Sequence, residues 1–199
     1  YVPHRLQEGY GVNAEALRKI ISAGAGMIIT VDCGISAAEP VARARRAGAQ
    51  VIVIDHHSPP DTLPEATVVH PTVGQSEYPN PHLAGAGVAF KLAWALGQRM
   101  GDGRTVPDPY REMLMEALPL VAIGTIADVC PLVDENRVLV SYGLKTLSVS
   151  PRPGMRALMA AARLAGGPIS ARDVAFRLAP RLNAAGRMGD AKVAVELLM

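Results

Sequence analysis

The chain has 199 residues, 49% of them hydrophobic, which is enough to bury the core of one large domain. Its formal net charge of +2 identifies no partner, so any contact with nucleic acid has to come from a local basic patch. No apolar run approaches the roughly 20 residues that span a bilayer, and no signal peptide is recognisable. Cys33 and Cys130 form no CxxC pair, which argues against a zinc ribbon and favours a reducing compartment. We therefore expect a cytoplasmic protein with no membrane partner.

The first part of the chain alternates helical segments with short apolar runs. Asn13 is a suitable cap for a helix over AEALRKIISAG, and Ser36 for a second helix over Ser36–Gly48. The runs MIITV (27–31), VIVI (51–54) and TVV (67–69) predict strands. Strands that are separated by helices of about 12 residues imply βαβ units and a parallel sheet, whose buried strands read as continuous apolar runs.

The rest of the chain is mostly helical. Residues 70–81 predict a loop, SPRPG (150–154) a linker between two lobes, and Pro119 a break or kink in its helix. Helices are expected over Gly85–Arg99, Tyr110–Ala127 and Asp134–Ser148, with a later one capped by Ser170. The predicted fold class is α/β, a parallel β-sheet flanked by helices and followed by a mainly helical segment. The predicted domains are residues 1–149 and 150–199.

Polar side chains follow three of the apolar runs directly. Asp32 follows MIITV, Asp55, His56 and His57 follow VIVI, and Asp128 follows VAIGTIA. Because ligands bind outside the carboxyl ends of parallel strands, the first two groups should lie at one edge of the sheet. Carboxylates with one or two imidazoles suit manganese, magnesium or zinc, and the scarcity of thiolates favours a hard oxygen and nitrogen site. The alternative for Asp32 is an ordinary helix cap before GIS, and for a single histidine a satisfied polar residue.

Basic residues form two further candidate groups. Arg181, Asn183 and Arg187 lie in RLNAAGRM, where arginine forks match phosphate oxygens. His4 and Arg5 lie in YVPHR near the start of the chain. The alternative for RLNAAGRM is a solvated helix end with glycine as its cap. The segment AGAGVAFK (84–91) opens a helix with small residues, which favours close packing over an anion site.

Taken in order, PHR…GYG, TVDCGI, IDHH, AGAGVAFK, IADVCPL and RLNAAGRM resemble the RecJ-type exonucleases of the DHH phosphoesterase superfamily, over essentially the whole chain. The resemblance implies 5′→3′ hydrolysis of single-stranded DNA by two metal ions, Mn²⁺ or Mg²⁺, in DNA repair and recombination. It also implies a single-strand-binding protein and a helicase as partners.

The resemblance implies a role for each matching residue. Asp32 corresponds to a carboxylate that bridges two metal ions, and His56 and Asp128 to ligands of one of them. His57 corresponds to a residue beside the metals and the scissile phosphate, and Asp55 to a group that orients the histidines. The residues that correspond to groups holding the nucleic-acid backbone are His4, Arg5, Arg181, Asn183 and Arg187.

The family's first motif, DxDxxG, does not occur in the sequence. We expect it before Tyr1, in a longer protein that also carries a DHH-associated domain and an OB-fold after Met199. The 199-residue fragment should therefore bind metal weakly and have little or no activity alone. Two alternatives remain: a DHH phosphodiesterase acting on short oligonucleotides or cyclic dinucleotides, and a non-catalytic RecJ-like binding module.

Overall fold

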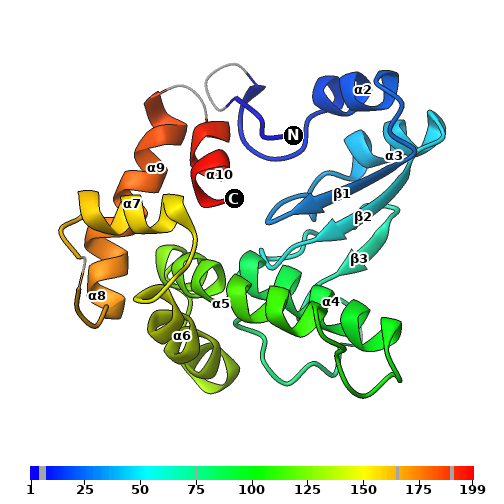
Figure 1. Ribbon diagram of the computed structural model, residues 1–199. Coiled ribbons are helices and arrows are strands. Elements are labelled where there is room, and N and C mark those ends of the chain that lie inside the picture. Colours follow the sequence, from blue (N-terminus) through cyan, green and yellow to red (C-terminus); the bar gives the residue numbers. More distant parts are fainter. Residues whose placement is uncertain (5–7, 75, 165, 189–190) are drawn as a thin grey trace. The chain divides into compact units, whose positions relative to one another are not determined.

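The computed structural model of the protein describes residues 1–4, 8–74, 76–164, 166–188 and 191–199 (Figure 1). They form two compact units, an N-terminal unit of residues 3–89 and a C-terminal unit of residues 90–199 together with residues 1–2. Each unit has its own hydrophobic core.

The N-terminal unit is built on a parallel sheet of three strands in the order β1-β2-β3 (Figure 1). The strands are β1 (Met27–Val31), β2 (Gln50–Ile54) and β3 (Thr67–Val69). In the register, Val31 of β1 faces Ile54 of β2, and Ile54 faces Val69 of β3. The three strands therefore end side by side, which confirms the predicted parallel sheet and brings the residues that follow the strands to one edge.

Helices α2 (Ala14–Ser22) and α3 (Ala38–Arg46) pack against this sheet. Helix α2 begins at the predicted cap, because Oδ1 of Asn13 accepts a hydrogen bond of 2.7 Å from the Ala16 amide. Helix α3 begins one residue later than a cap at Ser36 would place it, with Ala37 at the cap position and no side-chain capping bond, so the prediction of Ser36 as its cap was wrong. The core of the unit joins the helices to the sheet through Leu17, Ile28, Val41 and Val53, among others.

The C-terminal unit is helical, as predicted. Its elements are α5 (Tyr110–Ala127), α6 (Asp134–Leu147), α7 (Pro153–Ala161), α8 (Ala171–Asp173), the π-helix η1 (Val174–Leu178), α9 (Ala179–Met188) and α10 (Lys192–Leu198). Helix α4 (Gly85–Met100) runs through residue 90, where this unit begins. None of the helices in the described part of the chain is both long and apolar enough to cross a membrane.

Helices α5 and α6 pack closely because α6 has a glycine at the contact. A Cβ atom added at Gly143 would lie 2.4 Å from the Leu118 carbonyl oxygen of α5. Pro119 is buried inside α5, which continues through it, so the predicted break is wrong. The predicted kink stays a prediction, since proline leaves the helix one hydrogen bond short.

Residues on both sides of residue 150 share one core. Ile126 and Leu147 pack in the same cluster as Met155, Leu158 and Val174. Pro153 and Gly154 of the expected linker form the first turn of α7. The domain boundary between residues 149 and 150 stays a prediction.

Candidate metal centre

Asp32 directly follows β1 and is held at the edge of the sheet by its backbone. Its amide donates a hydrogen bond of 2.9 Å to the carbonyl oxygen of Ile54, the last residue of β2. Its φ of 61° is in the left-handed region, which non-glycine residues adopt rarely and which often marks functional turns. The side chain is 58% exposed, so the carboxylate remains accessible.

The turn after Asp32 is fixed by its neighbours. The Thr30 hydroxyl donates a hydrogen bond of 2.8 Å to the carbonyl oxygen of Cys33. Gly34 has a φ of 113°, and a Cβ atom at this position would lie 2.6 Å from the Thr30 hydroxyl oxygen. The sequence DCG therefore needs glycine as its third residue, both for backbone conformation and for space.

Asp55 directly follows β2, is only 1% exposed, and acts as a hydrogen-bond hub. Its carboxylate accepts bonds from the amides of Ile35 (2.9 Å) and His56 (2.8 Å), and from Nδ1 of His57 (2.7 Å). Burial alone would raise the pKa of this carboxyl, but the hydrogen bonds outweigh it and leave the pKa below the usual value. Asp55 is therefore an ionised acceptor that orients its neighbours rather than a ligand open to solvent.

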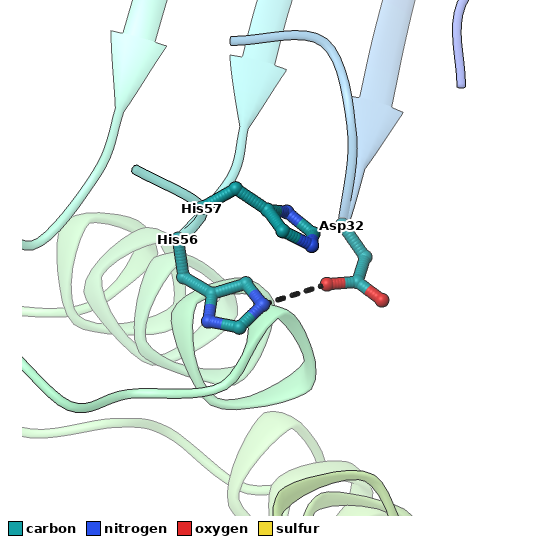
Figure 2. A group of neighbouring side chains, drawn as sticks. All are labelled: Asp32, His56 and His57. Atoms are coloured by element: carbon teal, nitrogen blue, oxygen red, sulfur yellow. Dashed lines mark ion pairs between the residues drawn. The ribbon is translucent and has the colours of Figure 1, made fainter. Parts of the chain in front are cut away.

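Figure 2 shows Asp32, His56 and His57 gathered where β1 and β2 end. Nε2 of His56 lies 3.2 Å from Oδ1 of Asp32, and the two imidazole rings are tilted by 54° with centroids 4.6 Å apart. Because ionised Asp55 can only accept, His57 donates through Nδ1 and keeps its lone pair on Nε2. That tautomer is the one a metal ligand requires at Nε2.

The first residue of α4, Gly85, gives the Asp32 carboxylate its space. A Cβ atom at Gly85 would lie 2.2 Å from Oδ1 and 2.6 Å from Cγ of Asp32. The carboxylate therefore lies against the amino-terminal end of a 16-residue helix, where the helix dipole favours negative charge.

The donor set fits a hard divalent cation. One ligand atom from each of Asp32, His56 and His57 can be chosen so that all lie within 4.8 Å of one another. Ligands about 2.1 Å from one ion can be at most about 4.2 Å apart, so a small movement would let all three bind the same ion. Burial, followed by the charges of Asp55 and Asp32, raises the pKa of the Cys33 thiol, and Cys33 is not among the grouped ligand atoms of Asp32, His56 and His57. Oxygen and nitrogen ligands without thiolate suit Mn²⁺ or Mg²⁺.

Asp128 lies in the C-terminal unit, at the C-cap of α5. Its amide bonds the Gly124 carbonyl oxygen, and one of its carboxylate oxygens accepts a 3.3 Å hydrogen bond from the Cys130 thiol. The side chain is exposed. Its role as a ligand beside Asp32 and His56 stays a prediction.

The predicted backbone-binding residues of RLNAAGRM lie on α9. Arg181, Asn183 and Arg187 are all exposed along this helix. Gly186 is buried within the helix and does not end it, which removes the alternative of a glycine cap. Near the start of the chain, the His4 amide bonds a Glu8 carboxylate oxygen at 2.7 Å, whereas Arg5 lies outside the described residues.

Two contributors to the site were missed by the sequence analysis. Nε2 of His70, which directly follows β3, lies 2.8 Å from the carbonyl oxygen of His57 and supports that segment. Its position directly after a third predicted strand could have identified His70 as a residue of the same sheet edge. Gly85 was interpreted as a packing residue, and only the position of the Asp32 carboxylate reveals its role.

The comparisons with known proteins agree with this geometry. Residues 1–125 match the DHH family, N-terminal domain. The whole chain is 46% identical to the single-stranded-DNA-specific exonuclease RecJ of Bacillus subtilis (strain 168) and 43% identical to that of Escherichia coli (strain K12). It covers 24% and 35% of these two relatives, so it spans about a quarter to a third of their length.

Solved structures give the same result. The chain matches a crystal structure of exonuclease RecJ bound to manganese with a TM-score of 0.83 and 44% identity, over 100% of this chain and 48% of that one. It matches RecJ in complex with Mn²⁺ from Thermus thermophilus with a TM-score of 0.80 and 41% identity, over 94% and 26% of the two chains. With the strand-end aspartate and the Asp-His-His triplet at one sheet edge, the chain belongs to the DHH family.

Proposed function

We propose that the chain forms part of the catalytic core of a metal-dependent exonuclease that hydrolyses single-stranded DNA. The observation that carries the proposal is the cluster of Asp32, His56 and His57 at one sheet edge, with ligand atoms within 4.8 Å of one another. The RecJ relatives, which are named single-stranded-DNA-specific exonucleases, support the substrate. Cleavage from the 5′ end follows from the resemblance alone.

Each residue of the candidate site has its own proposed role. Asp32 and His56 would hold the cation, with Asp128 as a further ligand, and His57 would lie beside the scissile phosphate. Asp55 would fix the tautomer of His57 and stabilise the turn that carries both histidines, through its bonds to their amides. When bound, divalent cations supply an activated water and stabilise the leaving oxygen. The residues that would hold the phosphate backbone are His4, Arg5, Arg181, Asn183 and Arg187.

The test uses the protein as its gene encodes it, with Mn²⁺ and a 5′-phosphorylated single strand. Duplex DNA, short RNA and a cyclic dinucleotide serve as competing substrates, because they separate the exonuclease from DHH phosphodiesterases of small substrates. Release of mononucleotides from the single strand is expected, with loss of that release in Asp32→Ala and His56→Ala. The matched control is Asp61→Ala, which removes an exposed aspartate of the same unit. Unchanged activity in both site variants would refute the assignment.

A single-strand-binding protein and a helicase are proposed as partners on the resemblance alone. A place in the cytoplasm is proposed because the two isolated cysteines favour a reducing compartment. Copurification of the tagged protein from cells treated with nuclease tests the partners without a nucleic-acid bridge. Recovery of neither partner would withdraw that part of the proposal and leave the exonuclease untouched.

A further inference from the structure

The segment that includes α8, η1 and α9 has one buried side and one exposed side. Val174 and Leu178 are fully buried in the core of the C-terminal unit. Phe176, between them in η1, is 74% exposed. The exposed residues of the segment are Arg172, Phe176, Pro180, Arg181, Asn183 and Arg187.

The exposed side is basic. Residues 171–187, all of which the structure describes, contain four arginines and one acidic residue, Asp173. Asp173 bonds the Ser170 hydroxyl at 2.6 Å and Nη1 of Arg177 at 3.1 Å. The acid is thus paired with Arg177, which leaves the charges of Arg172, Arg181 and Arg187 unbalanced within this segment. An isolated exposed phenylalanine is ordinary, but one in a short segment with three such arginines matches an anionic, aromatic ligand.

Phe176 is carried on a firmly anchored backbone. The Ala179 amide bonds the Val174 carbonyl oxygen, the i→i+5 bond of a π-helix, and π-bulges occur often at functional sites. Nη2 of Arg177 donates a hydrogen bond of 2.9 Å to the Arg163 carbonyl oxygen beyond the end of α7. The Arg181 side chain turns back along the helix and bonds the Arg177 carbonyl oxygen, so it points toward η1. A ring on such a backbone loses little conformational freedom when it meets a ligand.

We propose that Phe176 is a base-stacking residue for a single nucleic-acid strand that lies along this side of the segment, with Arg172 and Arg181 contacting its phosphates. The inference rests on the proposed function, which supplies the single strand. The phenyl ring stacks on any base, and guanidinium groups match phosphate oxygens, so recognition is independent of sequence. A duplex offers no unstacked base to the ring, so the same contact favours single strands. A protein segment that covers Phe176 is the competing outcome.

The direct test places a fluorophore at the stacking position. Phe176→Trp in the full-length protein adds one indole to the tryptophans already present, which include Trp94. The difference in emission between Phe176→Trp and the wild type comes from the new indole, and we expect a poly-dT oligonucleotide to quench this difference. The matched control is Tyr142→Trp on α6, because Tyr142 is an aromatic of the same unit and is 53% exposed. The stacking role is overturned if DNA does not change the emission of the introduced indole. It is also overturned if acrylamide fails to quench that indole before DNA is added, which would show that the indole is shielded from solvent.

Affinity measurements separate stacking from packing. Phe176→Ala and Phe176→Leu should each weaken binding of a poly-dT strand roughly 5- to 100-fold, whereas Phe176→Trp should retain it. The loss should disappear on a strand of abasic nucleotides. Arg172→Ala should lower the salt dependence of binding by about 0.7 in the slope of log K against log salt. If Phe176→Ala and Phe176→Leu lost as much affinity for the abasic strand as for the base-containing strand, the stacking role would be overturned.

The two proposals fail in different ways. If the wild-type protein degrades single strands but Phe176→Ala has the same KM, the stacking role fails and the nuclease stands. If DNA quenches the indole introduced by Phe176→Trp but no strand is hydrolysed with Mn²⁺, the nuclease fails and the binding surface stands.

Discussion

Oδ1 of Asp32 lies where a side chain at residue 85 would begin, because a Cβ atom built on Gly85 would be only 2.2 Å from it. The left-handed backbone of Asp32, with a φ of 61°, carries the carboxylate to this place against the start of α4. The close approach depends on a residue without a side chain. Gly85 thus determines where the candidate ligand can be, although it offers no ligand atom of its own.

Gly85→Ala should therefore weaken metal binding. The added methyl group has to displace the carboxylate, which we expect to raise the Kd for Mn²⁺ roughly 10- to 100-fold, as for the loss of other groups that position a ligand. Overpacking should also cost about 1–3 kcal/mol of unfolding free energy. Titration calorimetry and urea unfolding of the full-length protein measure the two effects. Gly26→Ala is the control, since an added Cβ there meets nothing within 4 Å.

Asp55→Asn tests the hydrogen-bond hub beneath the histidines. The neutral amide keeps the size of the side chain but has only one accepting oxygen, so it cannot keep both the bond from the Ile35 amide, which goes to Oδ2, and the bond from Nδ1 of His57, which goes to Oδ1. Loss of either bond, together with the loss of negative charge, loosens the turn that carries His57 and the proposed ligand His56. We expect Mn²⁺ affinity to fall roughly 10- to 100-fold. Equal affinity in Asp55→Asn and in the exposed control Asp61→Asn would show that Asp55 has no orienting role.

The sheet and the meeting of Asp32 with the histidines were predictable because they depend on strand order alone. Parallel strands that end together bring the residues of VDCG and IDHH to one edge, whatever the loops do. The start of α3 and the role of Gly85 were not predictable, since they depend on where a backbone turn places one side chain. The π-helix at Val174–Leu178 has no sequence signal that distinguishes it from an α-helix, so the exposed position of Phe176 also needed coordinates.

The capping box of α8 should make stability depend on pH. Hydrogen bonds from Ser170, and after them Arg177, lower the pKa of Asp173 from its usual value of 3.8. The unfolded chain therefore binds the proton more readily, and the stabilisation is present above about pH 4 and lost as the pH falls through the folded-state pKa. Asp173→Asn should lower the urea midpoint at pH 7 and leave it nearly unchanged at an acidic pH well below the folded-state pKa of Asp173, where the carboxyl is protonated in both states. A double-mutant cycle with Ser170→Ala should show coupling at neutral pH only, and equal coupling at both pH values would contradict the assignment.

Met155→Ala tests whether residues after 150 belong to the same folding unit as α5 and α6. Met155 is fully buried in a cluster with Ile126 and Leu147. Truncation to alanine should cost about 2–5 kcal/mol, and the loss should appear in the hydrogen exchange of α5 amides as well as those of α7. Met113→Ala is the control, because Met113 is 49% exposed. Faster exchange confined to α7 and the segments after it would support a folding boundary near residue 150.

Asp128→Asn tests whether Asp128, which lies in the C-terminal unit, is a ligand of the metal. If Asp128 binds the same cation as Asp32 and His56, the loss of its charge should cost more than the roughly 10- to 100-fold that ligand-positioning groups cost, because a direct ligand is removed. Glu112→Gln is the matched control, since Glu112 is an exposed carboxylate in the first turn of the same helix. The Mn²⁺ Kd and the rate of single-strand hydrolysis should change together in Asp128→Asn and remain at wild-type values in Glu112→Gln. If Asp128→Asn and the control had the same Kd for Mn²⁺, Asp128 would not be a ligand. The protein ligands would then be the strand-end residues of the N-terminal unit.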